Sequence, residues 1–235
     1  MVSMLEAKNI YKSFGDKKVL RGLSISLKPG DIIGLVGKSG CGKSTFLKIL
    51  VGFYSMDKGK LVFNGKDITK NQDKIRKKVG YTTQENAFYE KLTVYENLMY
   101  YANLYGVKKQ NLRDYLESLL DSVELLDSKD KLAGDISGGM KRRLDFAISI
   151  VHDPELIILD EPTAGLDPLL IDKFWSVVEK VVRKGNKAVM MSSHILGEIE
   201  EHCNIAAIMK SGKISNQLKI TKKTNLEKEF RKLVK

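Results

Sequence analysis

The chain has 235 residues, a length that fits one large domain or one domain with a sizeable insertion. Hydrophobic residues make up 43% of the sequence, which is enough for a packed core and excludes an intrinsically disordered chain. No apolar stretch approaches the roughly 18 residues that cross a bilayer, and no signal-peptide pattern opens the sequence. We therefore expect a soluble, cytoplasmic chain with no transmembrane segment of its own.

The formal net charge of +11 raises the question of a nucleic-acid partner. Much of the excess lies in residues 210–235, which hold nine Lys or Arg and two Glu. Such a tail can touch anionic lipid headgroups or RNA, but a solvated terminus is the commoner case. We therefore expect a domain over residues 1–215, a basic C-terminal tail over residues 216–235, and no nucleic-acid partner.

The N-terminal stretch predicts an antiparallel hairpin. Residues 5–27 alternate apolar and polar at strand period, and the turn signal Gly15-Asp16-Lys17 interrupts them. Phe14 stands just before that turn. An exposed aromatic ring beside a nucleotide site can stack on adenine, whereas a buried one is part of the hairpin core, and the sequence leaves both alternatives open.

A glycine-rich loop follows a short apolar strand over residues 31–36 and precedes a predicted helix. Its pattern, G-x-x-x-x-G-K-[ST], is typical of a phosphate-binding loop, in which glycines aim backbone N–H groups and a helix dipole at an anion. The flanking elements disfavour the alternative of a glycine-rich turn with a surface lysine. We expect Lys43 to reach the β- and γ-phosphates and Ser44 to hold magnesium. The loop consists of Gly37, Lys38, Ser39, Gly40, Cys41, Gly42, Lys43, Ser44 and Thr45.

The next segments predict two strands and then a run of helices. Residues 59–65 read as a strand that ends in an Asn-Gly turn, and residues 77–83 as a strand that closes on Gln84. Thr93 and Glu96 form a capping box that opens a helix. A second helix is predicted from an apolar face made of Leu112, Tyr115, Leu116, Leu119, Leu120, Val123 and Leu126.

Two further motifs point to phosphate chemistry. Ser137-Gly138-Gly139 precedes an apolar helix, so Ser137 as N-cap would open a second anion-binding helix terminus. Residues 156–159 form a continuous apolar run, typical of a buried parallel strand, which ends on Asp160 and Glu161. We expect Asp160 to support a metal ion and Glu161 to orient or deprotonate water, the alternative being a solvated turn.

A further strand over residues 188–191 ends near His194. A lone histidine after a strand is more often structural than functional, but this one shares a sheet edge with the acidic pair, which makes a γ-phosphate contact a reasonable hypothesis.

The fold class expected from these elements is α/β. We predict a phosphate-loop nucleotide hydrolase core with a mixed sheet, an N-terminal antiparallel β subdomain, and an inserted α-helical subdomain at about residues 85–150.

From about residue 4 to residue 215 the sequence resembles the ATP-binding cassette (ABC) ATPases of membrane transporters. The family's motifs occur in the family's order, and the signature is the most specific of them because other phosphate-loop families lack it. The matching residues are Phe14, the loop over residues 37–45, Gln84, Ser137-Gly138-Gly139-Met140, residues 156–161, Asp167 and His194.

The resemblance implies a head-to-tail dimer, homomeric or heteromeric, that binds ATP between the loop of one subunit and Ser137, Gly138 and Gly139 of the other. It implies that Glu161 is the general base and that His194 holds the γ-phosphate and water in line. Magnesium would be held by Ser44, Gln84 and Asp160. A separate integral membrane permease would be the partner, with the chain peripheral on the cytoplasmic face of the membrane.

The residue after the signature glycines separates branches of the family. Met140 stands where glutamine is commonest, and this resembles the branch of drug and polysaccharide or lipid-linked exporters. We therefore predict export. The alternative is that Met140 is a packing residue without bearing on the direction of transport. A rival prediction is a non-transport cassette ATPase, and an iron–sulfur-assembly relative is the one that size does not exclude. A third is a nucleic-acid binder that uses the basic tail.

Overall fold

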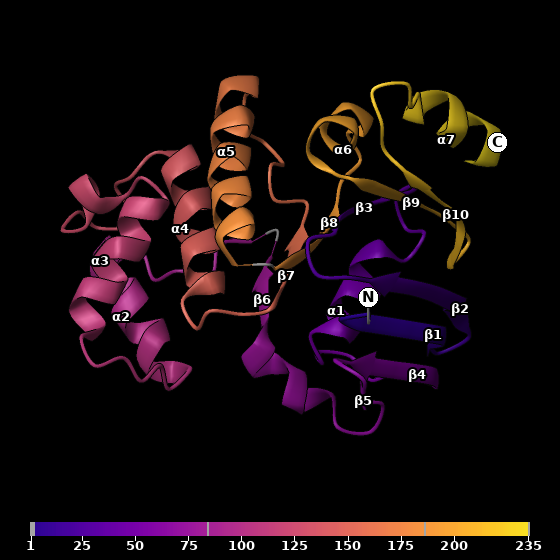
Figure 1. Ribbon diagram of the computed structural model, residues 1–235, viewed down its shortest axis with the longest axis horizontal. Coiled ribbons are helices and arrows are strands. Elements are labelled where there is room, and N and C mark those ends of the chain that lie inside the picture. The colour runs from indigo at the N-terminus through magenta and orange to yellow at the C-terminus, as the bar shows by residue number, and fades with distance from the viewer. Residues whose placement is uncertain (1–2, 84, 186, 235) are drawn as a thin grey trace.

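Two β-sheets form the framework of the chain, which is described here from a computed structural model covering residues 3–83, 85–185 and 187–234 (Figure 1). The smaller sheet is antiparallel, as the hairpin pattern predicts. Asn64 and Gly65, with φ of 47° and 74°, make the predicted Asn-Gly turn that joins its last two strands. The strand order is β2 (Lys17–Leu27), β1 (Leu5–Phe14), β4 (Lys58–Phe63) and β5 (Lys66–Asp67).

The larger sheet is mixed and carries the site at the carboxyl ends of its parallel strands. Its side chains alternate between two cores: Ile157 and Leu159 face one hydrophobic cluster, whereas Leu156 and Ile158 face the other. Only the pairing of β10 with β9 is antiparallel. The strand order is β10 (Lys213–Lys219), β9 (Ile205–Lys210), β3 (Ile32–Val36), β8 (Ala188–Ser192), β7 (Leu156–Asp160) and β6 (Val79–Thr82).

The helices cover both faces of this sheet. Phe46 and Leu47 of α1 are buried in the cluster that joins the two sheets, whereas α2 to α5 pack on the other face. Figure 1 shows α2, α3 and α4 gathered at the left, away from the small sheet. The helices are α1 (Lys43–Leu50), α2 (Val94–Leu104), α3 (Leu112–Ser122), α4 (Gly138–Ile150), α5 (Pro168–Gly185), α6 (Leu196–His202) and α7 (Leu226–Val234), with 3₁₀ turns η1 (Gln72–Lys78) and η2 (Leu126–Ser128).

The predicted fold class is confirmed, but some element boundaries differ. Helix α3 ends at Ser122, before the predicted face ends at Leu126, because Glu124 takes a left-handed φ of 56° that no α-helix continues. Strand β6 begins at Val79, since the two lysines before it belong to η1. The basic C-terminal stretch contains most of β10 and all of α7, and Leu226 of that helix is buried. The division at residue 215 stays a prediction.

Candidate nucleotide-hydrolysis site

The predicted phosphate loop lies between the end of β3 and the start of α1. Gly42 is the N-cap of α1 with a φ of 108°, and a Cβ there would come within 2.9 Å of Leu20 Cδ2, so only glycine fits. The Lys43 ammonium is buried and donates a hydrogen bond of 3.0 Å to the carbonyl of Gly37. The loop therefore holds the Lys43 ammonium on its concave side, where a bound phosphate would contact it.

A pocket of about 410 Å³ opens onto this loop. It has the size of a small-molecule site. Lys38 is exposed beside it, and its carbonyl accepts a hydrogen bond from the Cys41 N–H. Burial raises the pKa of the Cys41 thiol, which therefore stays neutral and is no nucleophile. The pocket is lined by Phe14, Lys17, Val19, Ser39, Gly40, Gly42, Lys43, Ser44, Thr45 and Glu161.

Phe14 reaches the pocket from the end of β1. Its side chain is 43% exposed, so it is not part of the hairpin core. The edge of Tyr54 packs on it with ring centroids 5.1 Å apart, and the Lys12 ammonium lies 5.2 Å from its ring centroid. The ring is thus held by two neighbours and is still partly exposed at the pocket, where it could contact a planar base.

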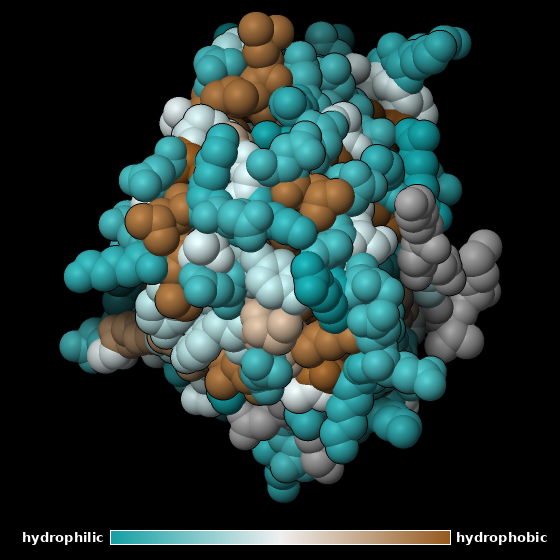
Figure 2. All heavy atoms as spheres, turned by 90° about the vertical axis from the view of Figure 1, so that its left-hand side faces the viewer, coloured by the Kyte–Doolittle hydropathy of each residue, from teal (hydrophilic) through white to brown (hydrophobic). Residues whose placement is uncertain are grey.

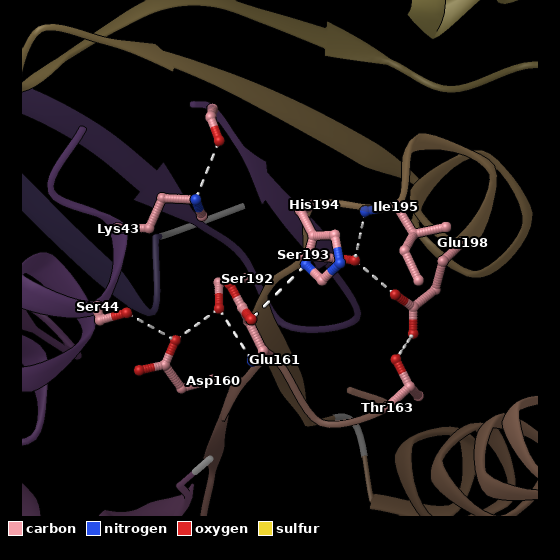
Figure 3. A network of polar contacts seen from close by, with 11 residues as sticks. Lys43, Ser44, Asp160, Glu161, Thr163, Ser192, Ser193, His194, Ile195 and Glu198 are labelled. Carbon is pink, nitrogen blue, oxygen red and sulfur yellow. Dashed lines mark hydrogen bonds and ion pairs between the residues drawn. The ribbon is translucent and has the colours of Figure 1, made fainter. Parts of the chain in front are cut away.

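The acidic pair is anchored by a serine that the sequence analysis did not single out (Figure 3). Asp160 Oδ1 accepts hydrogen bonds from Ser44 Oγ at 3.1 Å and from Ser192 Oγ at 2.6 Å. The Glu161 N–H in turn donates to Ser192 Oγ at 3.0 Å. Ser192 is fully buried at the end of β8, so its hydroxyl joins two neighbouring strands at the edge where the loop lies.

Glu161 leaves the strand with an unusual backbone. Its φ of 50° lies in the left-handed region, which residues other than glycine rarely adopt. Its carboxylate Oε2 lies 3.6 Å from Nδ1 of His194, and the two side chains are 24% and 64% exposed. Figure 3 shows both side chains near Asp160 and Ser44, so four predicted site residues meet at one sheet edge.

Three predicted residues do not reach that edge. Ser137 caps α4 by accepting a hydrogen bond of 3.4 Å from the Met140 N–H, as predicted for an N-cap. A Cβ on Gly139 would lie 2.7 Å from Leu170 at the start of α5, so glycine permits this close packing. The described residues that line the pocket at the phosphate loop do not include Ser137, Gly138 or Gly139. Within one chain, the second anion-binding terminus is separate from the first.

Helix α4 is also bound to the segment that contains Gln84, a residue outside the described ranges. Arg142 Nη1 donates to the carbonyl of Thr83 at 3.2 Å, and the Ala87 N–H donates to Asp145 Oδ1 at 2.8 Å. Burial raises the pKa of Asp145 to about 6. No local sequence pattern marks Asp145, because its backbone partner is 58 residues away in the chain.

The two sheets, the loop between β3 and α1, and the acidic pair at the end of β7 define a phosphate-loop nucleotide hydrolase. A model of the ABC transporter family matches residues 20–164, and the chain belongs to that family. It is an ATP-binding and ATP-hydrolysing subunit of the ABC transporter type, as its sequence predicts.

Known relatives agree with this assignment. The chain is 37% identical over 212 residues to the linearmycin resistance ATP-binding protein LnrL of Bacillus subtilis (strain 168), covering 90% of this chain and 68% of the relative. It is 34% identical over 212 residues to the Nod factor export ATP-binding protein I of Burkholderia orbicola (strain AU 1054), covering 90% and 69%. A solved ATP-binding subunit of an ABC transporter matches with a TM-score of 0.86 at 26% identity, over 99% of this chain and all of that one.

Proposed function

We propose that this chain drives an exporter whose membrane-crossing part is a separate permease, and that it works as a dimer at the cytoplasmic face of the membrane. The observation that carries the proposal is that Ser44 and Glu161 line the pocket, while Asp160 bonds to Ser44 and His194 lies beside Glu161. The export direction is supported by the two relatives, which are named for linearmycin resistance and for Nod factor export. The separate permease fits a second observation: throughout the described ranges, every helix is too short or too polar to cross a membrane.

The donor set at the pocket edge fits a magnesium ion. Ser44 offers a hydroxyl and Asp160 a carboxylate, and oxygen ligands are those that magnesium prefers. The 3.1 Å between Ser44 Oγ and Asp160 Oδ1 supports a shared ion, which we propose these two residues hold together with Gln84. When bound, the ion neutralises charge on the β- and γ-phosphates.

In the proposed mechanism, Glu161 is the general base for hydrolysis. Its carboxylate takes a proton from the attacking water as the water oxygen bonds to the γ-phosphorus and the bond to the β-phosphate oxygen breaks, which releases ADP and phosphate. His194, beside Glu161, orients that water and the γ-phosphate. Lys43 exchanges its hydrogen bond to the neutral Gly37 carbonyl for one to an anionic phosphate oxygen, in which donor and acceptor are both charged. Phe14 stacks on the adenine.

The second anion-binding terminus belongs, in this proposal, to the ATP on the partner subunit. Ser137, Gly138 and Gly139 present the N-terminus of α4, and they lie away from the described lining of the pocket in their own chain. A head-to-tail dimer, whether of two identical or two related chains, would bring this terminus over the partner's phosphate loop.

The helical part is the proposed docking face for the permease. Tyr89 and Tyr100 are about half exposed there with ring centroids 5.1 Å apart, and Leu104 and Leu132 are exposed as well. Figure 2 shows hydrophobic areas separated by hydrophilic side chains on the face of α2 and α3. Aromatic and leucine side chains in a mixed surface are typical of protein interfaces.

The experiment that tests the proposed mechanism is the substitution Glu161→Gln, which keeps the size of the side chain and removes the base. We expect ATP binding to persist while hydrolysis falls about 100-fold or more, and we expect a dimer that persists in ATP by size-exclusion chromatography. Glu155→Gln is the matched control, since Glu155 precedes the other end of β7 and pairs with Lys78. Normal turnover by the Glu161→Gln variant would refute the proposal.

A further inference from the structure

Glu198 is a buried carboxylate that the mechanism above does not use. It lies on α6 and is 5% exposed. Its Oε1 accepts hydrogen bonds from Thr163 Oγ at 2.5 Å and from Trp175 Nε1 at 2.9 Å, and its Oε2 accepts one from Ser193 Oγ at 2.6 Å. All three donors are neutral and themselves buried. A carboxylate removed from water in this way is costly, so an apolar side chain would fill the site more cheaply if packing were its only purpose.

The three donors come from three separate segments, two of which carry a residue of the proposed mechanism. Thr163 follows Glu161 by two residues, and Ser193 immediately precedes His194. Trp175 belongs to α5, the helix that begins right after Asp167. Figure 3 shows Glu198 reaching toward Thr163 and Ser193 from the side of His194 opposite the phosphate loop.

The backbone around His194 is fixed through the same carboxylate. Ser193 Oγ donates to Glu198 and accepts a hydrogen bond of 3.0 Å from the Ile195 N–H, so both chain neighbours of His194 are joined to one anchored hydroxyl. The His194 side chain is 64% exposed, so packing alone does not set its position. Its distance from Glu161 therefore depends on the anchor behind it.

We propose that Glu198 is a positioning residue for ATP hydrolysis, which holds the His194 loop and the segment after Glu161 at a fixed separation. This inference rests on the roles proposed above for Glu161 and His194. Small errors in the placement of reacting groups lower the rate of the chemical step far more than they lower substrate affinity. Glu198 would thus affect turnover without touching ATP.

The test compares Glu198→Gln with Glu201→Gln, an exposed residue of the same helix. We expect Glu198→Gln to lower kcat about 10- to 100-fold, to leave KM for ATP within about twofold, and to add little further loss in a chain that already carries His194→Ala. Trp175 is the only tryptophan of the chain, so its single indole N–H resonance should shift in the Glu198→Gln variant and not in the control.

Thr163→Val and Thr163→Ser keep the test decisive if Glu198→Gln does not fold. The valine removes one donor at nearly constant volume and should lower kcat, whereas the serine restores the hydroxyl and should restore kcat. Unchanged kcat in folded Glu198→Gln, or losses that multiply with that of His194→Ala, would overturn the inference. If Glu161→Gln and His194→Ala lower the rate of hydrolysis while folded Glu198→Gln keeps the wild-type kcat, only this inference fails. If Glu161→Gln hydrolyses normally, the proposed mechanism fails.

Discussion

At the scale of single residues, buried polar side chains hold the segments that carry the site residues. Ser192 illustrates this, because one hydroxyl donates to Asp160 and accepts from the Glu161 N–H. Glu198 has the same relation to the His194 loop. Exposed side chains lose entropy when they are held in one place, and these buried partners restrict them before ATP arrives.

At this scale, the buried carboxyl of Asp145 leads us to predict that the unfolding free energy depends on pH. Its pKa is raised to about 6 in the folded chain, so the folded state holds the proton more tightly than the unfolded state. The contribution of protonated Asp145 to the unfolding free energy is therefore fully present below about pH 4, and it is lost as the pH rises through about 6. Relative to Asp145→Asn, the wild-type chain should lose up to about 3 kcal/mol of unfolding free energy across this range.

Urea unfolding of both proteins at pH 4, 5, 6 and 8 measures this difference. The asparagine variant keeps an acceptor for the Ala87 N–H and lacks the titrating group, so other groups that titrate in the same range cancel in the comparison. A difference that stays constant from pH 4 to pH 8 would contradict the assignment.

At the scale of elements, the ends of the helices carry much of the local specificity. Helix α2 begins with a complete capping box, in which Thr93 Oγ accepts from the Glu96 N–H at 3.1 Å and the Glu96 carboxylate accepts from the Thr93 N–H at 2.7 Å. Helix α4 begins with Ser137, and its next turn holds Arg142 on the carbonyl of Thr83.

The cap of α2 gives a prediction for stability alone. Thr93→Ala should lower the unfolding free energy by about 1 kcal/mol, because the Glu96 N–H loses the side-chain oxygen that accepts its hydrogen bond. ATP hydrolysis should stay at the wild-type rate, since Thr93 is not part of the pocket. Thr93→Ser keeps the hydroxyl and should retain the stability in thermal unfolding. A loss of turnover in Thr93→Ala would show that α2 is coupled to the chemistry.

Among the elements, the features that sequence patterns predict are the local ones. The phosphate loop, the Thr93 cap and the Asn64-Gly65 turn depend on residues close together in the chain, and all three are where the patterns predict them. The two strands that carry Asp160 and Ser192 were likewise predicted from their continuous apolar runs.

Contacts between distant segments were not predictable in this way. Trp175 and Glu198 meet only because α5 and α6 pack side by side, and no residue pattern records that packing. Phe14 packs against Tyr54, 40 residues further along the chain, and stays 43% exposed, which local sequence does not record, so the sequence left two alternatives for it. The end of α3 depends on the φ of Glu124, a residue that ordinarily continues a helix.

At the scale of the whole molecule, the two anion-binding helix starts lie on separate parts of the chain. Helix α1 opens onto the pocket with Lys43 and Ser44, whereas α4 opens outside the described lining of that pocket. In the dimer that we propose, each loop would receive the N-terminus of α4 from the other chain, and the same contact would be made twice. The complete site would then be a property of the pair.

Mixing two inactive variants tests this arrangement. Lys43→Ala disables a loop and Ser137→Ala weakens a signature terminus, so each homodimer should be inactive or nearly so. A mixed dimer keeps one intact loop facing one intact terminus, and we expect hydrolysis to return at one of its two sites. Steady-state ATPase assays on the mixture measure this, with Lys43→Ala alone as the control. A mixture that stays inactive would show that both groups serve the same chain's ATP.

The left-handed backbone of Glu161 has a consequence for how this position can change. A residue with a side chain at a φ of 50° costs the fold about 1 kcal/mol or more, whereas glycine occupies that region without steric cost. Glycine would therefore be the more stable choice at position 161, and it would have no carboxylate. Fold and chemistry favour different residues at this one position, so a screen for thermal stability alone would select against the proposed base.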